Sequence, residues 1–423
     1  MSLLSSLNTG VSGLNASGQE LSVIGNNIAN MNTTGFKGST ISFGDLLDQT
    51  ISGLSGTSQV GLGVSVGAIT PELTQGSLQT TSNPLDIAVD GQGFFMVDNN
   101  GVTDYTRDGE FQTNAAGDIT TASGQILQGY LANATGTITG QLGDIQLQAN
   151  TSLPKATTTA NLDVNLDSGS AAPAAAWNAA WEGTATPPAT DTYNNMTSVT
   201  AYDSEGNAHS VDVYFINTST AANPNTWTAN YVYQDSSGNY QSAGTQNLGF
   251  NSSGDLTSLP TSALALNWGG GVANGAVTID LTGTTQVAGS FDVSNVNASG
   301  YAAGSLQSVA IGTNGLITGT YSNGQTQNIA QLALANFNAP TQLTAVGNNM
   351  FAQSGSSGQP IVGTPQTAGF GTTQSDALEQ SNVDVSQEFT NMISAQSAFE
   401  ANSKVISTTD TLLNDLMQMT NGA

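Results

Sequence analysis

The side chains that could carry out catalysis or bind a transition metal are few in this chain and lie far apart. His209 is the only histidine among 423 residues, and the sequence contains no cysteine. A zinc site and a Ser/His/Asp triad both need histidine or thiolate groups gathered with further ligands or with a nucleophile. The sequence therefore predicts neither, and it also excludes disulfide bonds. We interpret His209 as an ordinary residue of a hairpin strand.

A short acidic stretch resembles part of a calcium-binding loop. Asp98, Asn100 and Asp104 follow one another at short intervals. A calcium loop of the EF-hand type needs oxygen ligands at its first, third and fifth positions and a glutamate at its twelfth. The fifth position here is Val102 and the twelfth is Gly109. We therefore predict a turn and no metal site.

Three further candidates for chemistry have simpler explanations. Asp86 and Asp90 could act as the carboxylate pair of a glycosidase, but a chain with thirty acidic residues contains such pairs by chance. The Gly-Gln-Gly at 91–93 lacks a phosphate-loop lysine and a dinucleotide fingerprint, which leaves a tight turn. Tryptophans can form a platform for sugars, although single ones in β domains usually belong to the core; the four are Trp177, Trp181, Trp227 and Trp268. We predict no enzyme, no cofactor and no metal ion.

The composition favours short strands and turns and narrows the range of partners. Only 8% of the residues are charged and 49 are glycine. Four basic residues stand against thirty acidic ones, for a formal charge of −26, which argues against binding nucleic acid or anionic membranes. Copies of the chain can then associate only through apolar, hydrogen-bonded or neutral surfaces. No stretch reaches the ~20 apolar residues of a membrane span, and the first residues lack the features of a secretory signal. These rules predict a cytoplasmic protein, or one exported with its N-terminus uncut.

The last forty residues have the pattern of one long amphipathic helix. Asp384 is placed to cap its start, with Gln387 as the partner in a capping box, and Asn421-Gly422 is placed to end it. Apolar residues recur three and four positions apart, which predicts a coiled-coil type of seam: Val385, Phe389, Met392, Phe399, Ile406, Leu413 and Met417. The same ladder also passes through Gln396, Ser403 and Asp410.

The first thirty residues repeat this pattern. Their apolar residues follow a seven-residue spacing with the adjacent rungs filled: Leu3, Leu7, Val11, Leu14, Leu21, Ile24, Ile28 and Met31. Glycines weaken this segment as an isolated helix, each by about 1 kcal/mol relative to alanine; they are Gly10, Gly13, Gly18 and Gly25. We expect the two terminal helices to pair as a coiled coil or to pack on neighbouring chains. The alternative is that each packs on an ordinary globular core.

The region between the helices has the signals of an all-β structure. Asn-Gly pairs such as 314–315 and 323–324 stand between alternating apolar runs, which predicts hairpins. We predict an α+β multidomain fold with two mainly-β outer domains, the second inserted into the first. Its parts are a helical core domain (1–33 and 377–423), extended Gly/Ser-rich links (34–70 and 363–376), a discontinuous β domain (71–147 and 287–362) and an inserted β domain (148–286). Within the first link we expect little regular packing over 39–70.

Four stretches carry the motifs of a known family. They are residues 27–37 behind the first heptads, 83–95 with 105–109, 319–324 through 334–337, and 378–386 with the helix that follows. On these stretches the chain resembles the bacterial flagellar axial proteins of the rod and hook. Its length, the inserted 148–286 region, and the segment 202–209 leading into 213–215 make it more similar to the hook branch. The stretch 171–190 does not align, and Ser397 stands where many relatives have a basic residue.

The resemblance implies a structural subunit of a curved tubular polymer outside the cell, a universal joint that transmits motor torque from rod to filament. The terminal helices would form an inner coiled-coil tube around an export channel. Implied partners are further copies of the chain, the flagellar rod, the hook cap, the hook–filament junction proteins and the flagellar type III export apparatus, which would export it uncut. The family motif residues are Asn27, Ala29, Asn30, Gly35, Phe36 and Lys37.

Two other functions remain open at this point. A distal rod subunit shares most of the family motifs, and a straight polymer would favour it. From a different class, a secreted β-rich adhesin or glycan-binding protein would be a monomer that binds sugars through its tryptophan-bearing insert. An enzyme remains possible only through unrecognised carboxylates, and a screen of hydrolase substrates would test this.

Overall fold

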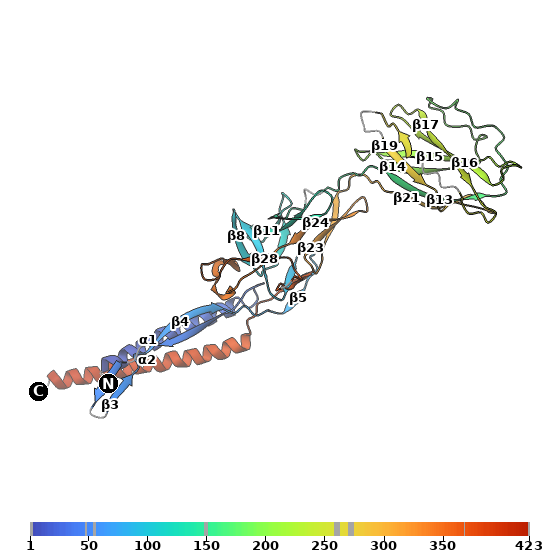
Figure 1. Cartoon of the computed structure of the whole chain (residues 1–423). Coiled ribbons are helices and arrows are strands. Elements are labelled where there is room, and N and C mark those ends of the chain that lie inside the picture. The colour runs from blue at the N-terminus through green and yellow to red at the C-terminus, as the bar shows by residue number, and fades with distance from the viewer. Residues whose placement is uncertain are drawn as a thin grey trace. The chain divides into compact units, whose positions relative to one another are not determined.

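The computed structural model describes residues 3–46, 49–53, 56–147, 151–257, 263–269, 275–367 and 369–421. The chain forms two compact units. Unit 1 comprises Met1–Asn150, Ser308–Gly319 and Gln327–Ala423, and unit 2 comprises Thr151–Gln307 and Thr320–Thr326. Two helices and a mainly-β body make up the fold (Figure 1).

The two helices of unit 1 pack against each other in antiparallel directions. Helix α1 runs over Leu3–Ala29 and α2 over Val385–Asn421. A Cβ built on Gly10 would lie 3.1 Å from Cγ1 of Ile406, whereas Asn27 near the end of α1 hydrogen-bonds Glu388 near the start of α2. Figure 1 shows α2 extending past the start of α1. Neither described helix is apolar over enough of its length to cross a membrane.

The predicted cap of α2 is confirmed in part. The carboxylate Oδ1 of Asp384 accepts hydrogen bonds from the backbone N–H groups of Ser386 (2.7 Å) and Gln387 (3.1 Å), as an N-cap should. The capping-box partner is wrong, because the Gln387 amide donates to Oδ1 of Asn391, one turn further on, at 3.0 Å. The helix ends at Asn421, and Gly422 lies outside the described residues.

The glycines of α1 have two different environments. A Cβ on Gly13 would lie 2.7–2.8 Å from three side-chain atoms of Asn402, so α2 approaches α1 closely at this point. A Cβ on Gly25 would meet nothing within 4 Å. Hence a methyl group at Gly13 would push the Asn402 side chain aside, whereas Gly25 only lowers the helix propensity of the segment.

A β arm lies along α1. Strands β1 (Ser39–Asp45) and β4 (Val64–Pro71) pair in antiparallel fashion, and β2 (Gln49–Gly53) pairs with β3 (Gly56–Val60). Both β1 and β4 contact α1, and the backbone N–H of Val64 donates to the Ser12 hydroxyl at 3.2 Å. The expectation of little regular packing over 39–70 is therefore wrong for these strands. β1 and β4 pair with each other and pack beside α1, where the hydroxyl of Ser12 accepts a backbone hydrogen bond.

The β body of unit 1 is built on one large sheet. Its main path is β22 (Leu306–Ile311), β23 (Leu316–Tyr321), β24 (Thr326–Leu332), β11 (Ile126–Ala132), β7 (Phe94–Asn99), β8 (Val102–Thr106), β27 (Met350–Ala352) and β26 (Thr344–Gly347). Side strands are β9 (Phe111–Thr113), β10 (Ile119–Thr121), β12 (Ile138–Asp144), β25 (Leu334–Asn336) and β28 (Ile361–Gly363), and η1 (Pro340–Gln342) is a short 3-10 helix. Two ribbons join β5 (Leu78–Thr80) to β30 (Ala377–Glu379) and β6 (Ile87–Asp90) to β29 (Thr372–Ser375).

Aromatic side chains fill the core of this body. Tyr105 and Phe337 lie edge to face with ring centres 4.8 Å apart, and Phe94 and Phe351 do so at 5.9 Å. The predicted turns are confirmed: Gly315 and Gly324 have φ of +74° and +75° between β22, β23 and β24. The acidic stretch at Asp98 is also a turn, since its carboxylate accepts the N–H of Gly101 at 3.0 Å.

Unit 2 consists of two sheets with a shared core. The first contains β14 (Asn195–Tyr202), β15 (Ala208–Asn217), β16 (Thr226–Gln234) and β17 (Tyr240–Gly249). The second contains β18 (Ala263–Leu266), β19 (Gly275–Asp280), β13 (Thr159–Asp167), β20 (Thr285–Val287) and β21 (Asp292–Ala298). Both sheets contribute to one apolar cluster, in which Trp227 is 0% and Trp268 2% exposed. These two tryptophans are core residues, as expected of β domains.

The stretch 171–190 packs on the outer face of the first sheet. Trp181 is buried against Tyr214 and Val232, and its ring centre lies 5.5 Å from that of Trp177. Tyr214 lies between the core residues Val213 and Phe215 in sequence, so the alternation of a strand turns it to the opposite face. The stretch therefore gives this sheet a second apolar layer.

The two glycines of α1 make a matched test of the helix contact. We expect Gly25→Ala to stabilise the helices by up to about 1 kcal/mol through helix propensity. Gly13→Ala should be less stable than Gly25→Ala, because its methyl group must displace Asn402. Thermal loss of helical circular dichroism in polymerised full-length protein measures both; equal shifts in melting temperature would contradict the close contact.

Candidate functional site: a buried ionic junction

Three segments that are distant in the sequence meet where the helices join the β body. Lys37 ends the turn region after α1, Arg107 directly follows β8, and Glu379 ends β30. The backbone brings them together: Glu379 lies opposite Leu78 in the β5–β30 ribbon, and its carbonyl oxygen accepts the N–H of Gly35 at 2.8 Å.

These three side chains form a buried ionic cluster. Nζ of Lys37 lies 2.6 Å from Oε1 of Glu379, and Nη1 of Arg107 lies 3.3 Å from Oε2. The side chains are 1%, 6% and 0% exposed for Lys37, Arg107 and Glu379. Two of the four basic residues in the whole chain are therefore used here.

Backbone groups satisfy most of the remaining polar atoms. Lys37 also donates to the carbonyl of Thr74 (2.7 Å), Arg107 donates to that of Gly91 (2.7 Å), and Gly76 donates to the Glu379 carboxylate (3.0 Å). The guanidinium carbon of Arg107 lies 5.3 Å from the ring centre of Phe94. A buried ion pair needs such additional hydrogen bonds because each charge has lost its water.

The surroundings shift the pKa values of the charged groups. Burial lowers the pKa of Lys37 and of Arg107, and the nearby Glu379 carboxylate opposes this shift in both. Next to Arg107, burial raises the pKa of Asp108 to about 6; the charges of Glu110 and Asp86 add to this, and a hydrogen bond from the Glu110 N–H opposes it.

Two asparagines join the chain ends around this cluster. Asn27 donates to the carbonyl of Ser39 (2.9 Å) and to Glu388 (3.0 Å), and it accepts the N–H of Ser39 (2.9 Å). Asn382 accepts the N–H of Gly38 (2.9 Å) and donates to the carbonyl of Glu72 (2.7 Å). Each amide thus holds the start of the β arm against the start of α2.

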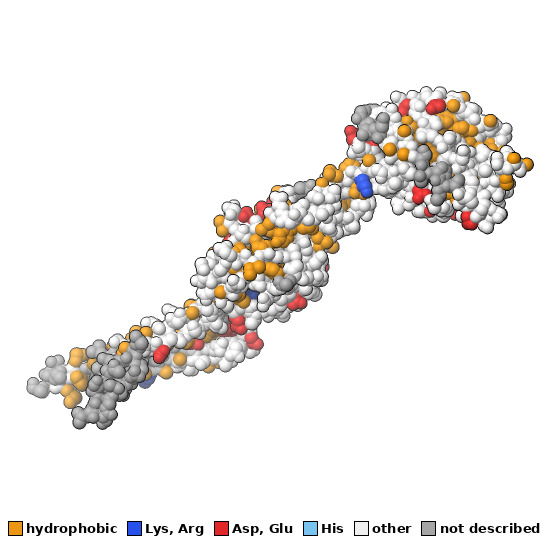
Figure 2. Space-filling model, in the orientation of Figure 1, with side chains coloured by type: hydrophobic (Ala, Val, Ile, Leu, Met, Phe, Trp, Pro, Cys, Tyr) orange, Lys and Arg blue, Asp and Glu red, His pale blue; other side chains and the backbone are white. Residues whose placement is uncertain are grey.

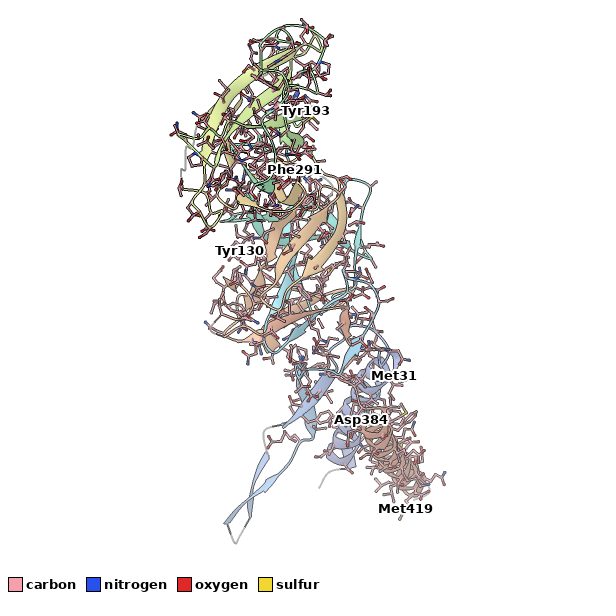
Figure 3. All side chains as sticks on the ribbon, turned by 90° about the vertical axis from the view of Figure 1, so that its right-hand side faces the viewer. Met31, Tyr130, Tyr193, Phe291, Asp384 and Met419 are labelled. Carbon is pink, nitrogen blue, oxygen red and sulfur yellow. The ribbon has the colours of Figure 1, made fainter. Side chains whose placement is uncertain are left out.

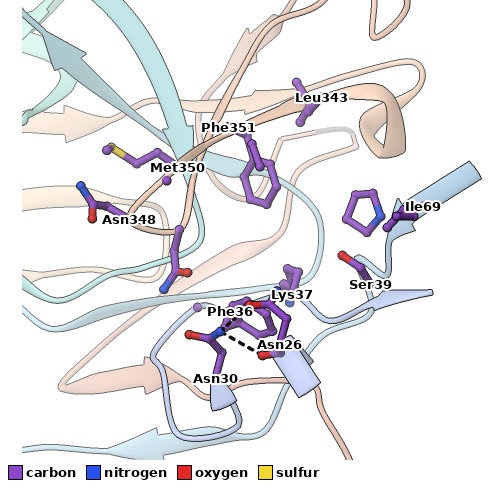
Figure 4. A pocket seen from close by; sticks show the side chains of 15 residues that line it. Asn26, Asn30, Phe36, Lys37, Ser39, Ile69, Leu343, Asn348, Met350 and Phe351 are labelled. Atoms are coloured by element: carbon purple, nitrogen blue, oxygen red, sulfur yellow. Dashed lines mark hydrogen bonds between the residues drawn. The ribbon is translucent and has the colours of Figure 1, made fainter. Parts of the chain in front are cut away.

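The other family-motif residues lie beside this junction. Gly35 has φ of +67°, and a Cβ there would lie 2.5 Å from the backbone nitrogen of Asp108, so only glycine fits. Asn30 donates to the carbonyl of Asn26 at 2.9 Å, and Phe36 is half-buried. Both line a cavity of about 540 Å³ between the end of α1, the β arm and the β26–β27 hairpin (Figure 4). Ala29 is the exposed last residue of α1.

The predicted seam residues of α2 divide into two groups. One row of the ladder lies half-buried: Val385, Met392, Phe399, Ile406 and Leu413. A second row lies one position before the other predicted rungs. In it Ala395 and Thr409 are buried, and Glu388 and Asn402 are half-buried. Of those predicted rungs, Phe389 is 51% and Met417 55% exposed.

In α1 the predicted seam is covered unevenly. Ile24 is buried and Val11 is 41% exposed. The remaining members are half-buried: Leu7, Leu14, Leu21 and Ile28. The fully buried positions of α1 also include small and polar residues, namely Gly10, Ala16, Ser17 and Asn27.

Sequence reasoning missed Arg107, Glu379, Asn382 and Asn402 as site residues. One available signal was that a chain with so few basic residues places two of them in family motifs.

His209 is on a strand, as predicted, where its Nε2 lies 2.9 Å from Oδ2 of Asp203 and its ring stacks on Trp268. Burial by itself would raise the pKa of Asp203, but hydrogen bonds from His209, Asn207 and the backbone hold this pKa well below its usual range. Among the described residues, no group of three or more His, Cys, Asp or Glu is placed to hold a metal ion.

Four family models match successive parts of the chain. Residues 7–37 match the family described as flagella basal body rod protein, and 88–166 match the flagellar hook protein FlgE/F/G D1 domain. Residues 161–301 match the flagellar basal body protein FlaE D2 domain, and 374–419 match the flagellar basal body rod FlgEFG protein C-terminal family.

Individual relatives extend over the full length. The flagellar hook protein FlgE of Escherichia coli (strain K12) is 37% identical over 421 residues, which cover 97% of this chain and 98% of that protein. FlgE of Salmonella typhimurium is 36% identical over 425 residues, covering 98% of this chain and all of that protein. A crystal structure of Helicobacter pylori flagellar hook protein FlgE2 matches 71% of this chain with a TM-score of 0.47 and 15% identity, too weak a similarity to support an argument.

Removing the anion of the buried cluster should be strongly destabilising. Glu379→Gln leaves two buried cations without their carboxylate, which we expect to lower the free energy of unfolding by about 3–5 kcal/mol. Glu72→Gln, at an exposed site of the same unit, is the control and should change it by less than about 0.5 kcal/mol. Urea unfolding of both variants measures the difference, and similar values would mean that the cluster is not a stabilising junction.

Asp108 should make stability depend on pH between about 4 and 7. Its carboxyl has a pKa of about 6 in the folded protein against about 3.9 in an unfolded chain. The neutral form is therefore favoured by folding, and stability falls as pH rises through 6. Relative to Asp108→Asn, the original chain should lose at most about 2–3 kcal/mol between pH 4 and pH 7. Parallel pH dependence of the two unfolding free energies would refute this.

Proposed function

The chain belongs to the flagellar hook protein FlgE family and is a structural subunit of the flagellar hook, and from this premise we propose how its parts build and work a curved tubular polymer. In this proposal α1 and α2 pair as a coiled coil, and many such pairs form the innermost layer around a channel. The inner-core residues are those of the predicted seam, from Leu7 to Ile28 and from Val385 to Met417.

The observation that carries the proposal is a second apolar face on α2. After α1 has covered one face, Phe389 and Ile393, which lie four positions apart on another side of α2, remain 51% and 64% exposed. Burying such side chains stabilises by roughly 25 cal/mol per Å² of apolar surface. In a single chain these side chains stay exposed to water, whereas helices of neighbouring copies would bury them.

The acidic charge of the chain sets which surfaces can meet. At a net charge of −26, copies repel unless their contacts are uncharged. Figure 2 shows that most of the visible surface is neither charged nor apolar. Such surfaces make exchangeable polar contacts, which suit outer domains that shift past one another while the inner helices stay packed.

Torque transmission requires the helices to turn with the β body. The buried cluster of Lys37, Arg107 and Glu379, with the clamps of Asn27 and Asn382, supplies a stiff connection within unit 1. Bending would be accommodated outside it, by small shifts between copies. We propose the division into helical core (1–33 and 377–423), links (34–70 and 363–376), β domain (71–147 and 287–362) and inserted β domain (148–286). The start of compact unit 2 at Thr151 supports the start of the inserted domain, whereas unit 2 continues to Gln307, past residue 286.

The remaining parts of the proposal concern location and partners. The subunit would act outside the cell, after export through the flagellar type III apparatus without cleavage. Its partners would be other copies, the rod, the hook cap and the hook–filament junction proteins. We propose no enzymatic activity for it.

Two matched substitutions test the second face. Ile393 is 64% exposed in one chain, so Ile393→Ser should leave the stability of the monomer within about 0.5 kcal/mol while it greatly slows polymerisation. Ala398→Ser places the same side chain at an exposed position on another side of α2 and should polymerise normally. Electron microscopy and light scattering measure tube formation; equal polymerisation of both variants would contradict the proposal.

A truncated chain tests the polymer itself. A chain of residues 30–384 lacks both helices but keeps the ionic cluster, so its β structure should remain folded. We expect curved tubes from the full chain and only monomers from the truncated one. Straight tubes would favour a rod subunit, and a full chain that stays monomeric under polymerising conditions would favour the adhesin.

A further inference from the structure

The last two turns of α2 extend beyond its pairing with α1. Because Gly10 lies level with Ile406 in an antiparallel pair, the described start of α1 at Leu3 lies near Leu413. Leu412, Leu416 and Met419 are 49%, 54% and 77% exposed. Their spacing of four and three places them on one side of the helix, the arrangement by which a helix docks into a groove. Figure 3 shows Met419 at the end of α2 opposite Asp384.

A cavity lies at the opposite end of the helical pair. It measures about 540 Å³ and is lined by Asn30 and Phe36 after α1, Ile69 of the β arm, and Ala345 and Met350 of the β26–β27 hairpin (Figure 4). None of the described residues that line it is acidic, and its one cation, Lys37, is bound to Glu379. Ile69 is 52% exposed at its edge.

We propose that residues 412–419 of one copy occupy this cavity in the next copy, so that the chains join head to tail; this rests on the proposed function. The end of α2 carries the partial negative charge of a helix C-terminus and has no basic residue in its last turn. Acidic surfaces of another copy repel such an end. The cavity accepts it because its lining is apolar and amide-bearing without a carboxylate.

The C-terminal end of α2 and the cavity are different surfaces of the same chain, and this difference determines the kind of assembly. A contact between unlike surfaces repeats from copy to copy, and it produces an open helical filament when the rotation between copies does not close a ring. Asn27 donates to Glu388, so the cavity end lies level with residue 388 of α2. From Glu388 to Leu416 is 28 residues, so the step between copies measured along α2 is about 42 Å at 1.5 Å per residue.

Cysteine cross-linking tests this contact directly, because the natural chain has no cysteine. Leu416→Cys chains and Ala345→Cys chains are mixed, polymerised and oxidised. We expect a covalent dimer that contains one chain of each kind. The control replaces Leu416→Cys by Asn414→Cys, an exposed position on the far side of the helix from Leu412, and should give at least tenfold less of this dimer.

The outcomes separate this contact from the polymer as such. Tubes that form without the mixed dimer, or with only dimers of two Leu416→Cys chains, would overturn the head-to-tail contact and leave the hook proposal intact. Absence of tubes from the unmodified chain would instead overturn the proposed function. A repeat along the tube that differs from about 42 Å by more than about 10 Å, with the helices parallel to the tube axis, would also count against the contact.

Discussion

The fold of unit 1 depends on one carboxylate buried between two cations. Glu379 receives Lys37 at 2.6 Å and Arg107 at 3.3 Å, across sequence separations of 342 and 272 residues. Desolvation makes each of these charges unstable without its partners, so the three segments must arrive together. The end of α1, the β body and the approach to α2 are thereby held as one body, and a rotation applied to the helices is passed to the strands.

The helical pair is built for close approach within the chain and for association outside it. Glycines at Gly10 and Gly13 let α2 come near enough for Ile406 and Asn402 to contact the backbone of α1. The same glycines make α1 a poor helix by itself, and α2 keeps a second apolar face in the single chain. Both features favour helices that reach their full stability only among neighbouring copies.

Unit 2 has a different source of stability. Its two sheets share a core that includes Trp227, Tyr231 and Trp268, while the stretch 171–190 adds a small aromatic cluster on the opposite face of one sheet. The tryptophans that suggested a sugar platform therefore pack in the interior or in this second layer. A well-filled core beneath a polar surface suits an outer domain that makes only exchangeable contacts.

The sequence alone determined the two helices, the cap at Asp384 and the hairpin turns at Asn-Gly pairs, because periodicity, capping and turn formation are local properties. It did not determine which neighbouring row of α2 faces α1. Spacings of three and four both fit a helical period of 3.6, and apolarity favoured Phe389. Gly13 of α1 instead leaves room for the polar Asn402, and Asn27 binds Glu388. Nor could it place Lys37, Arg107 and Glu379 in the interior. An unpaired charge is more stable in water than in the interior. Only the tertiary structure brings these three distant segments together and gives each charge a partner.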